Sequence, residues 1–133
     1  MNTLAPLVSV IDDDESVRES LPDLLKIFGF SSQTFASALD FLATKSFDKT
    51  SCLILDVAMP GMSGPELSRE LRNLGYTIPT IFITGQVDAA SRAAIPADAV
   101  ACLTKPFTDT ALLDALRMAL NMNNARLNHS ILK

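Results

Sequence analysis

The stretch CLILDVAMPGMSG, at residues 52–64, joins a short apolar run to one acidic residue and a turn-rich segment. Its first four residues predict a β-strand buried on both faces, because the run is too apolar for the alternation of a half-buried strand. In open parallel sheets, ligands bind beyond the carboxyl ends of the strands. The stretch therefore indicates an α/β fold with Asp56 at the ligand-binding edge.

Other apolar runs also end in polar residues suited to metal and phosphoryl chemistry. VSVI at residues 8–11 precedes Asp12 and Asp13, IFI at 81–83 precedes Thr84, and VACL at 100–103 leads through Thr104 to Lys105. Because the carboxyl ends of parallel strands share one edge, we expect these side chains to converge on Asp56.

Strand and helix patterns alternate along the chain. Strands are expected over residues 7–11, 30–35, 52–55, 79–83 and 100–104, with the second at an edge. Asp14 or Ser16 can cap the first helix and Ser37 the second, Pro65 fits the first position of the third, and the last opens at Thr108 or Asp109. The fourth helix should begin near Asp88 and stop before Pro96. Right-handed crossovers then place helices on both faces of a parallel sheet.

Length and charge restrict the class of protein. At 133 residues the chain fits one domain, and its net charge of -4 argues against a nucleic-acid-binding surface. No apolar run approaches the ~18 residues of a membrane span. We therefore expect a cytoplasmic protein that contacts neither nucleic acid nor a membrane directly, with Cys52 and Cys102 as buried thiols.

The acidic residues indicate a metal site. Asp12, Asp13 and Asp56 on one edge would repel one another, and Mg²⁺ is the hard cation that suits carboxylate and carbonyl oxygens. Residues 12–15 can equally be a capping cluster before the first helix, but that reading leaves Asp56 unexplained. Asp56 is the best candidate nucleophile for forming an aspartyl-phosphate. Lys105 and Thr84 could then bind phosphoryl oxygens.

Several motifs resemble the receiver domain of bacterial two-component response regulators. They are VIDDD at residues 10–14, LILDVAMPGMSG at 53–64, ITG at 83–85 and TKPF at 104–107. With Gly29-Phe30 and Phe41-Leu42, they are most similar to FixJ-type receivers. The resemblance implies a flavodoxin-like (βα)5 fold with strand order 2-1-3-4-5. The receiver domain is expected over residues 1–120. Residues 121–133 are Asn-rich and lack clear periodicity, which favours a helix end or a linker toward an output domain.

The same resemblance assigns roles around the metal. Asp56 matches the phosphoacceptor, and Asp13 and the backbone carbonyl of Ala58 match Mg²⁺ ligands beside Asp56. Asp12 matches a ligand that acts through water. All of these groups are present, which favours a receiver that can be phosphorylated.

Further residues match the family's switch. Thr84 matches its hydroxyl, Lys105 its phosphoryl-binding lysine, and Pro106 a proline that usually follows a cis peptide bond. Cys102 departs from the pattern, since Tyr or Phe normally stands there and swings inward on activation. The resemblance implies a sensor histidine kinase as phosphoryl donor and a LuxR-type DNA-binding output domain. Phosphorylation-dependent homodimerisation is one way such a domain signals.

Three alternative functions are a phosphatase, a cofactor-binding protein and a stand-alone regulator. A metal-dependent phosphatase acting through an aspartyl-phosphate would need a second Asp where Ala58 stands. A flavodoxin-like cofactor binder would need a hydroxyl-rich phosphate loop at residues 12–15, which are all acidic. A stand-alone regulator without an output domain stays open. The expected function is a signalling switch that catalyses only its own phosphorylation and dephosphorylation.

Overall fold

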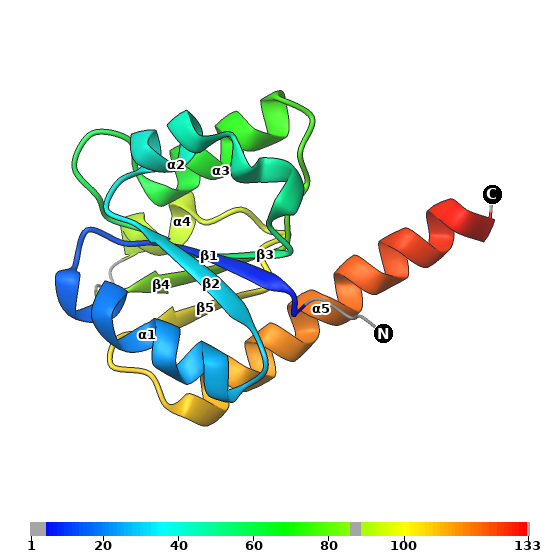
Figure 1. Ribbon diagram of the computed structural model, residues 1–133. Helices are drawn as coiled ribbons and strands as arrows, with labels where there is room; N and C mark the ends of the chain where they lie inside the picture. Colours follow the sequence, from blue (N-terminus) through cyan, green and yellow to red (C-terminus); the bar gives the residue numbers. More distant parts are fainter. Residues whose placement is uncertain (1–4, 86–88, 133) are drawn as a thin grey trace.

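The computed structural model describes residues 5–85 and 89–132, as a twisted parallel sheet between two layers of helices (Figure 1). The strands are β1 (Leu7–Ile11), β2 (Ser31–Phe35), β3 (Cys52–Asp56), β4 (Thr80–Thr84) and β5 (Ala101–Thr104). Their order in the sheet is β2-β1-β3-β4-β5, and all neighbours are parallel. This confirms the predicted flavodoxin-like fold with β2 at an edge.

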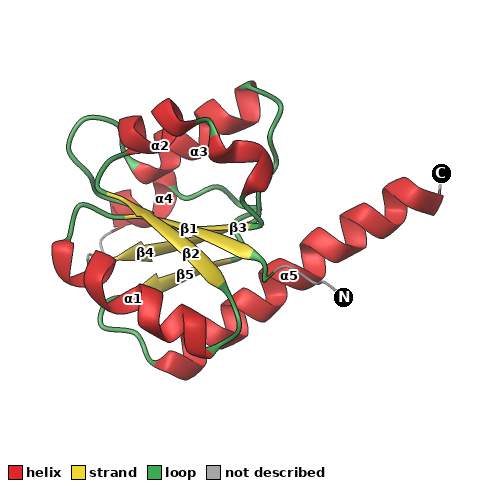
Figure 2. Cartoon of the chain, viewed as in Figure 1, coloured by secondary structure: helices red, strands yellow, loops and turns green. Residues whose placement is uncertain are grey.

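The helices are α1 (Glu15–Ile27), α2 (Ala38–Thr44), α3 (Gly64–Asn73), α4 (Ala89–Ala94) and α5 (Asp109–Leu132), with a 3₁₀ turn η1 (Ser46–Lys49). Figure 2 shows α1 and α5 on one face of the sheet and α2, α3 and α4 on the other. No helix in the described ranges is long and apolar enough to cross a membrane.

Each central strand contributes to two hydrophobic cores because successive side chains point to opposite faces. Ile54 packs with α1 and α5 residues such as Leu25 and Leu116, whereas the next residue, Leu55, packs with Phe41 and Leu67 of the other layer. All residues of β3 and β4 are buried. Burial on both faces is why these strands are continuous apolar runs.

Side-chain caps fix the helix starts near the carboxyl edge of the sheet. Asp14 caps α1 by accepting a hydrogen bond from the Ser16 N–H at 2.9 Å, which decides between the two predicted caps. Ser63 and Glu66 form a reciprocal capping box on α3. Helix α3 begins at Gly64, so Pro65 is its second residue and not the first as predicted.

The two cysteines differ in burial, and helices α4 and α5 differ in how far they extend. Cys52 is fully buried as predicted, but Cys102 is only partly buried because β5 lies at the edge of the sheet. Helix α4 has no buried residue and ends at Ala94, before Ile95 and Pro96, as the proline predicts. The predicted start of this helix at Asp88 lies outside the described residues. Helix α5 continues through residue 121 and runs past the sheet (Figure 1).

Candidate functional site

Three carboxylates meet where β1 and β3 end. Asp12 and Asp13 follow β1, and Asp56 is the last residue of β3, the strand that pairs with β1. One carboxylate oxygen from each residue lies within 4.8 Å of the others. Asp12 and Asp56 are buried, whereas Asp13 is exposed. The structure thus brings together the acidic residues that the strand ends predicted.

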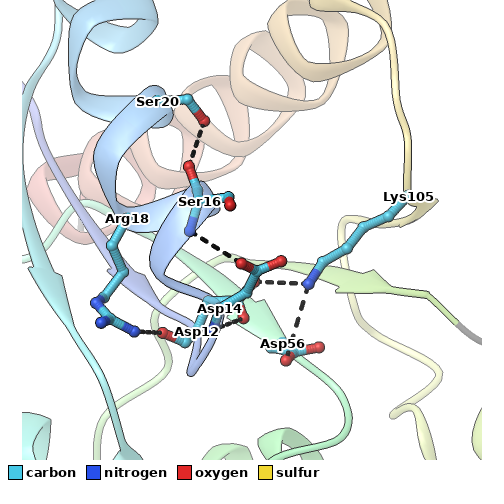
Figure 3. Close-up of polar contacts among 7 residues, drawn as sticks. All are labelled: Asp12, Asp14, Ser16, Arg18, Ser20, Asp56 and Lys105. Carbon is cyan, nitrogen blue, oxygen red and sulfur yellow. Dashed lines mark hydrogen bonds and ion pairs between the residues drawn. The ribbon is translucent and has the colours of Figure 1, made fainter.

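Lys105 reaches this cluster from the loop after β5 (Figure 3). Its Nζ lies 2.9 Å from Asp12 Oδ2 and 4.0 Å from Asp56 Oδ2. Within the described part of the chain, no donor forms a hydrogen bond to Asp12 Oδ2. The polar contact of this oxygen is the ion pair with Lys105. The peptide bond between Lys105 and Pro106 is cis, as the resemblance implied.

Burial and charge change the acidity of the cluster. Burial, followed by the charge of Asp12, raises the pKa of Asp56 from 3.8 to about 7, although Lys105 opposes the shift. Partial burial disfavours the Lys105 ammonium, but its close contact with Asp12 and the charges of the nearby carboxylates outweigh this and raise its pKa. A single ammonium therefore does not offset all the negative charge of the cluster.

The donor set fits a hard divalent cation. Carboxylate oxygens are the ligands that Mg²⁺ prefers, and the buried Asp12 Oδ2 lacks a hydrogen-bond donor among the residues described. Asp12, Asp13 and Asp56 are the side chains that would hold the ion. Ala58 is exposed in the loop after β3, and its carbonyl as a ligand stays a prediction.

Thr84 and Cys102 lie on the two strands beyond β3. Thr84 is the buried last residue of β4, and its carbonyl accepts a hydrogen bond from the Lys105 N–H at 2.8 Å. A shift of the β4 end would therefore reach Lys105 through the backbone. Cys102 is paired with Phe82 of β4 in the sheet register. The side chain of Cys102 is too small for the large rotamer change that an aromatic residue makes at this position.

The family model of the response regulator receiver domain matches residues 8–117. The chain belongs to this family. Response regulator protein TodT of Pseudomonas putida is 43% identical over 123 residues, which cover 92% of this chain and 54% of TodT. Transcriptional regulatory protein FixJ of Rhizobium meliloti is 41% identical over 113 residues, covering 84% of this chain and 55% of FixJ. This receiver chain spans about half the length of the curated relatives it matches.

Solved receiver structures agree with the fold. The response regulator StyR aligns with a TM-score of 0.82 at 40% identity, over 95% of this chain and 64% of StyR. The crystal structure of FixJ-N aligns with a TM-score of 0.77 at 38% identity, over 91% of this chain and 96% of FixJ-N. The acidic cluster and Lys105 thus lie in the receiver domain of a two-component response regulator.

The raised pKa of Asp56 predicts that the metal-free receiver loses stability as pH rises. The folded state keeps a proton on Asp56 up to about pH 7, whereas an unfolded chain releases it near 3.8, so unfolding releases protons between these values. From pH 5 to pH 8, the free energy of unfolding should fall by on the order of 2 kcal/mol through this group. Urea unfolding in EDTA at both pH values measures the fall.

Asp56→Asn should remove most of this dependence on pH. Asp114→Asn, an exposed position on α5, provides the matched control and should leave the dependence unchanged. An equal fall with pH in wild type and Asp56→Asn would contradict the assignment to Asp56.

Proposed function

We propose that this receiver is a phosphorylation-controlled switch in which Asp56 accepts a phosphoryl group from a sensor histidine kinase. The observation that carries the proposal is the group of three carboxylates within 4.8 Å, with the Lys105 ammonium 4.0 Å from Asp56. The family consists of signalling switches rather than classical enzymes, which supports a conformational state as the product.

In the proposed step, a carboxylate oxygen of Asp56 attacks phosphorus while the bond from phosphorus to the kinase histidine nitrogen breaks. The imidazole leaves with the bonding electron pair, so the phosphoryl group ends on Asp56. When bound by Asp12, Asp13 and Asp56, with the Ala58 carbonyl, Mg²⁺ supplies positive charge that offsets the carboxylates and the incoming phosphoryl oxygens.

Lys105 and Thr84 are the proposed partners of the new phosphoryl group. Lys105 already lies beside Asp56 and can hold one phosphoryl oxygen as a point charge. The Thr84 hydroxyl can donate a hydrogen bond to a second phosphoryl oxygen. The hydrogen bond from the Lys105 N–H to the Thr84 carbonyl couples these two residues. Movement at Thr84 would therefore shift the segment with Pro106 and, through β5, Cys102.

The output lies outside this chain in the proposal. The relatives include a transcriptional regulator about twice as long as the matched region, which supports a DNA-binding output domain. From the resemblance to FixJ-type receivers, we propose that this domain is of the LuxR type and follows the receiver. Residues 1–120 would be the phosphoacceptor domain, and residues 121–133 would lead toward the output domain. The phosphorylated form would signal by dimerising or by releasing that domain. We expect this exchange in the cytoplasm.

Intact-protein mass spectrometry after incubation with acetyl phosphate tests the proposal. Wild type should gain one phosphoryl group in the presence of Mg²⁺ and none in EDTA. If no group is gained, beryllofluoride binding distinguishes a short-lived phosphoryl group from an inactive site. The absence of both signals would overturn the proposal.

A further inference from the structure

Arg18 of α1 binds the backbone directly beside the acidic cluster. Its Nη1 donates a hydrogen bond to the Asp12 main-chain carbonyl at 3.0 Å (Figure 3). On the other side of the same residue, the Asp12 N–H donates to the Phe35 carbonyl at 3.1 Å. The main chain of Asp12 is thus held from α1 and from the end of β2.

The macrodipole of α1 does not account for a cation at the position of Arg18. Arg18 follows the helix start by one turn, where the macrodipole favours acidic side chains and disfavours a cation. In the part of the chain that the structure describes, its guanidinium forms no ion pair with the acidic side chains around it. The carbonyl of Asp12 is the acceptor it binds instead.

This bond fixes more than one residue because a peptide unit is planar. The Asp12 carbonyl and the Asp13 N–H belong to one rigid plane, so holding the oxygen restricts where the Asp13 Cα lies. The Asp12 side chain is held separately, by Lys105 and by the Asp14 N–H, which donates to Asp12 Oδ1 at 2.9 Å. Asp13 is exposed, so less packing surrounds its side chain than surrounds those of Asp12 and Asp56, and the placement of its backbone matters more.

We infer that Arg18 is a positioning residue for the metal site, holding the plane between Asp12 and Asp13 so that the Asp13 carboxylate stays with Asp56. This inference rests on the proposed function, because it assumes that the three carboxylates bind Mg²⁺. Arg18 touches neither the phosphoryl group nor the ion in this assignment. It acts through the backbone to which Asp13 is attached.

A role through charge alone predicts the opposite result. Arg18 carries positive charge next to an acidic cluster, so removing that charge would strengthen the attraction of a cation. Loss of positioning would weaken cation binding instead, by about tenfold for a residue that supports a ligand. The sign of the change therefore distinguishes the two roles.

The experiment is a Mg²⁺ titration followed by amide NMR shifts of the site in wild type, Arg18→Met, Arg18→Lys and Arg117→Met. Met keeps an unbranched aliphatic side chain but donates no hydrogen bond, whereas Lys can donate one to the Asp12 carbonyl. Arg117 is an exposed arginine of α5 and serves as the matched control. We expect the dissociation constant of Arg18→Met to rise about tenfold, that of Arg18→Lys to recover most of the loss, and that of Arg117→Met to stay at the wild-type value.

Two further readouts separate positioning from general destabilisation. With acetyl phosphate, Arg18→Met should need about tenfold more Mg²⁺ for half-maximal phosphorylation but reach nearly the wild-type rate at saturation. Its free energy of unfolding in EDTA should stay close to that of wild type. Unchanged or tighter Mg²⁺ binding in Arg18→Met would overturn the inference, as would a loss that Arg18→Lys fails to recover.

The proposed metal site itself is checked with Asp13→Asn. If wild type binds Mg²⁺ and Asp13→Asn weakens binding while Arg18→Met does not, the metal site stands and only the role of Arg18 fails. If wild type shows no Mg²⁺ binding that depends on Asp13, the metal site and the inference fail together.

Discussion

Asp56→Asn is expected to abolish phosphorylation by acetyl phosphate, a loss of more than about 10³-fold in rate. An amide oxygen carries no negative charge to attack phosphorus, while Asn keeps the size of the side chain. Asp56 ends a fully buried strand, so its backbone should remain in place after this change. Intact-protein mass spectrometry in the presence of Mg²⁺ measures the result directly.

Asp114→Asn is the matched control because it makes the same chemical change on the exposed side of α5. It should be phosphorylated at the wild-type rate. Lys105→Met would be a poorer test, since it leaves the buried Asp12 without its ion pair and confuses activity with stability. Phosphorylation of Asp56→Asn at a rate close to that of wild type would mean that another side chain accepts the group.

The fold was predictable because its signals are local. Strands such as β3 and β4 are buried on both faces, and this forces the short apolar runs that the sequence displays. Boundaries were less predictable. Pro65 is compatible with either of the first helical positions, so it could not decide whether α3 begins at Gly64 or one residue later.

The site was predictable in its membership but not in its contacts. Because the carboxyl ends of parallel strands share one edge, the sequence alone predicts that Asp12, Asp13 and Asp56 lie together. The capping reading is confirmed for Asp14, whereas metal binding by Asp12 and Asp13 stays a prediction. Asp14 caps α1, while Asp12 and Asp13 join Asp56. Only side-chain conformation could separate these roles.

Arg18 had no signal in the sequence, because its bond goes to a main-chain carbonyl and not to a complementary charged residue. A pattern of residue types reports which charges are available. It does not report which backbone groups a long side chain reaches.

Gly64 lies in the turn-rich segment of the sequence, and the structure shows why this position has no room for a side chain. A Cβ added there would lie 2.2 Å from the Asp56 main-chain oxygen and 3.0 Å from its carbonyl carbon. The Gly64 N–H also donates to the Val57 carbonyl at 3.1 Å. The start of α3 thus packs directly against the backbone of the candidate phosphoacceptor.

Gly64→Ala is therefore expected to lower the free energy of unfolding by about 2–4 kcal/mol. The obstructing atom is a backbone oxygen within the sheet edge, which cannot rotate away as the end of a side chain can. Gly85→Ala is the matched control, because a Cβ at Gly85 meets nothing within 4 Å. Its effect should stay within about 0.5 kcal/mol in the same urea unfolding experiment.

The collision should also affect phosphorylation, since relieving it requires the Asp56 backbone or the start of α3 to move. At a temperature where Gly64→Ala is fully folded, it should accept the phosphoryl group from acetyl phosphate about tenfold or more slowly than wild type, because small displacements of reacting groups are costly. Gly85→Ala should be compared at the same Mg²⁺ concentration. A folded Gly64→Ala protein with the wild-type rate would show that α3 yields to the added methyl group without moving Asp56. Wild-type stability as well would mean that the close approach of α3 to Asp56 is not a constraint on this fold.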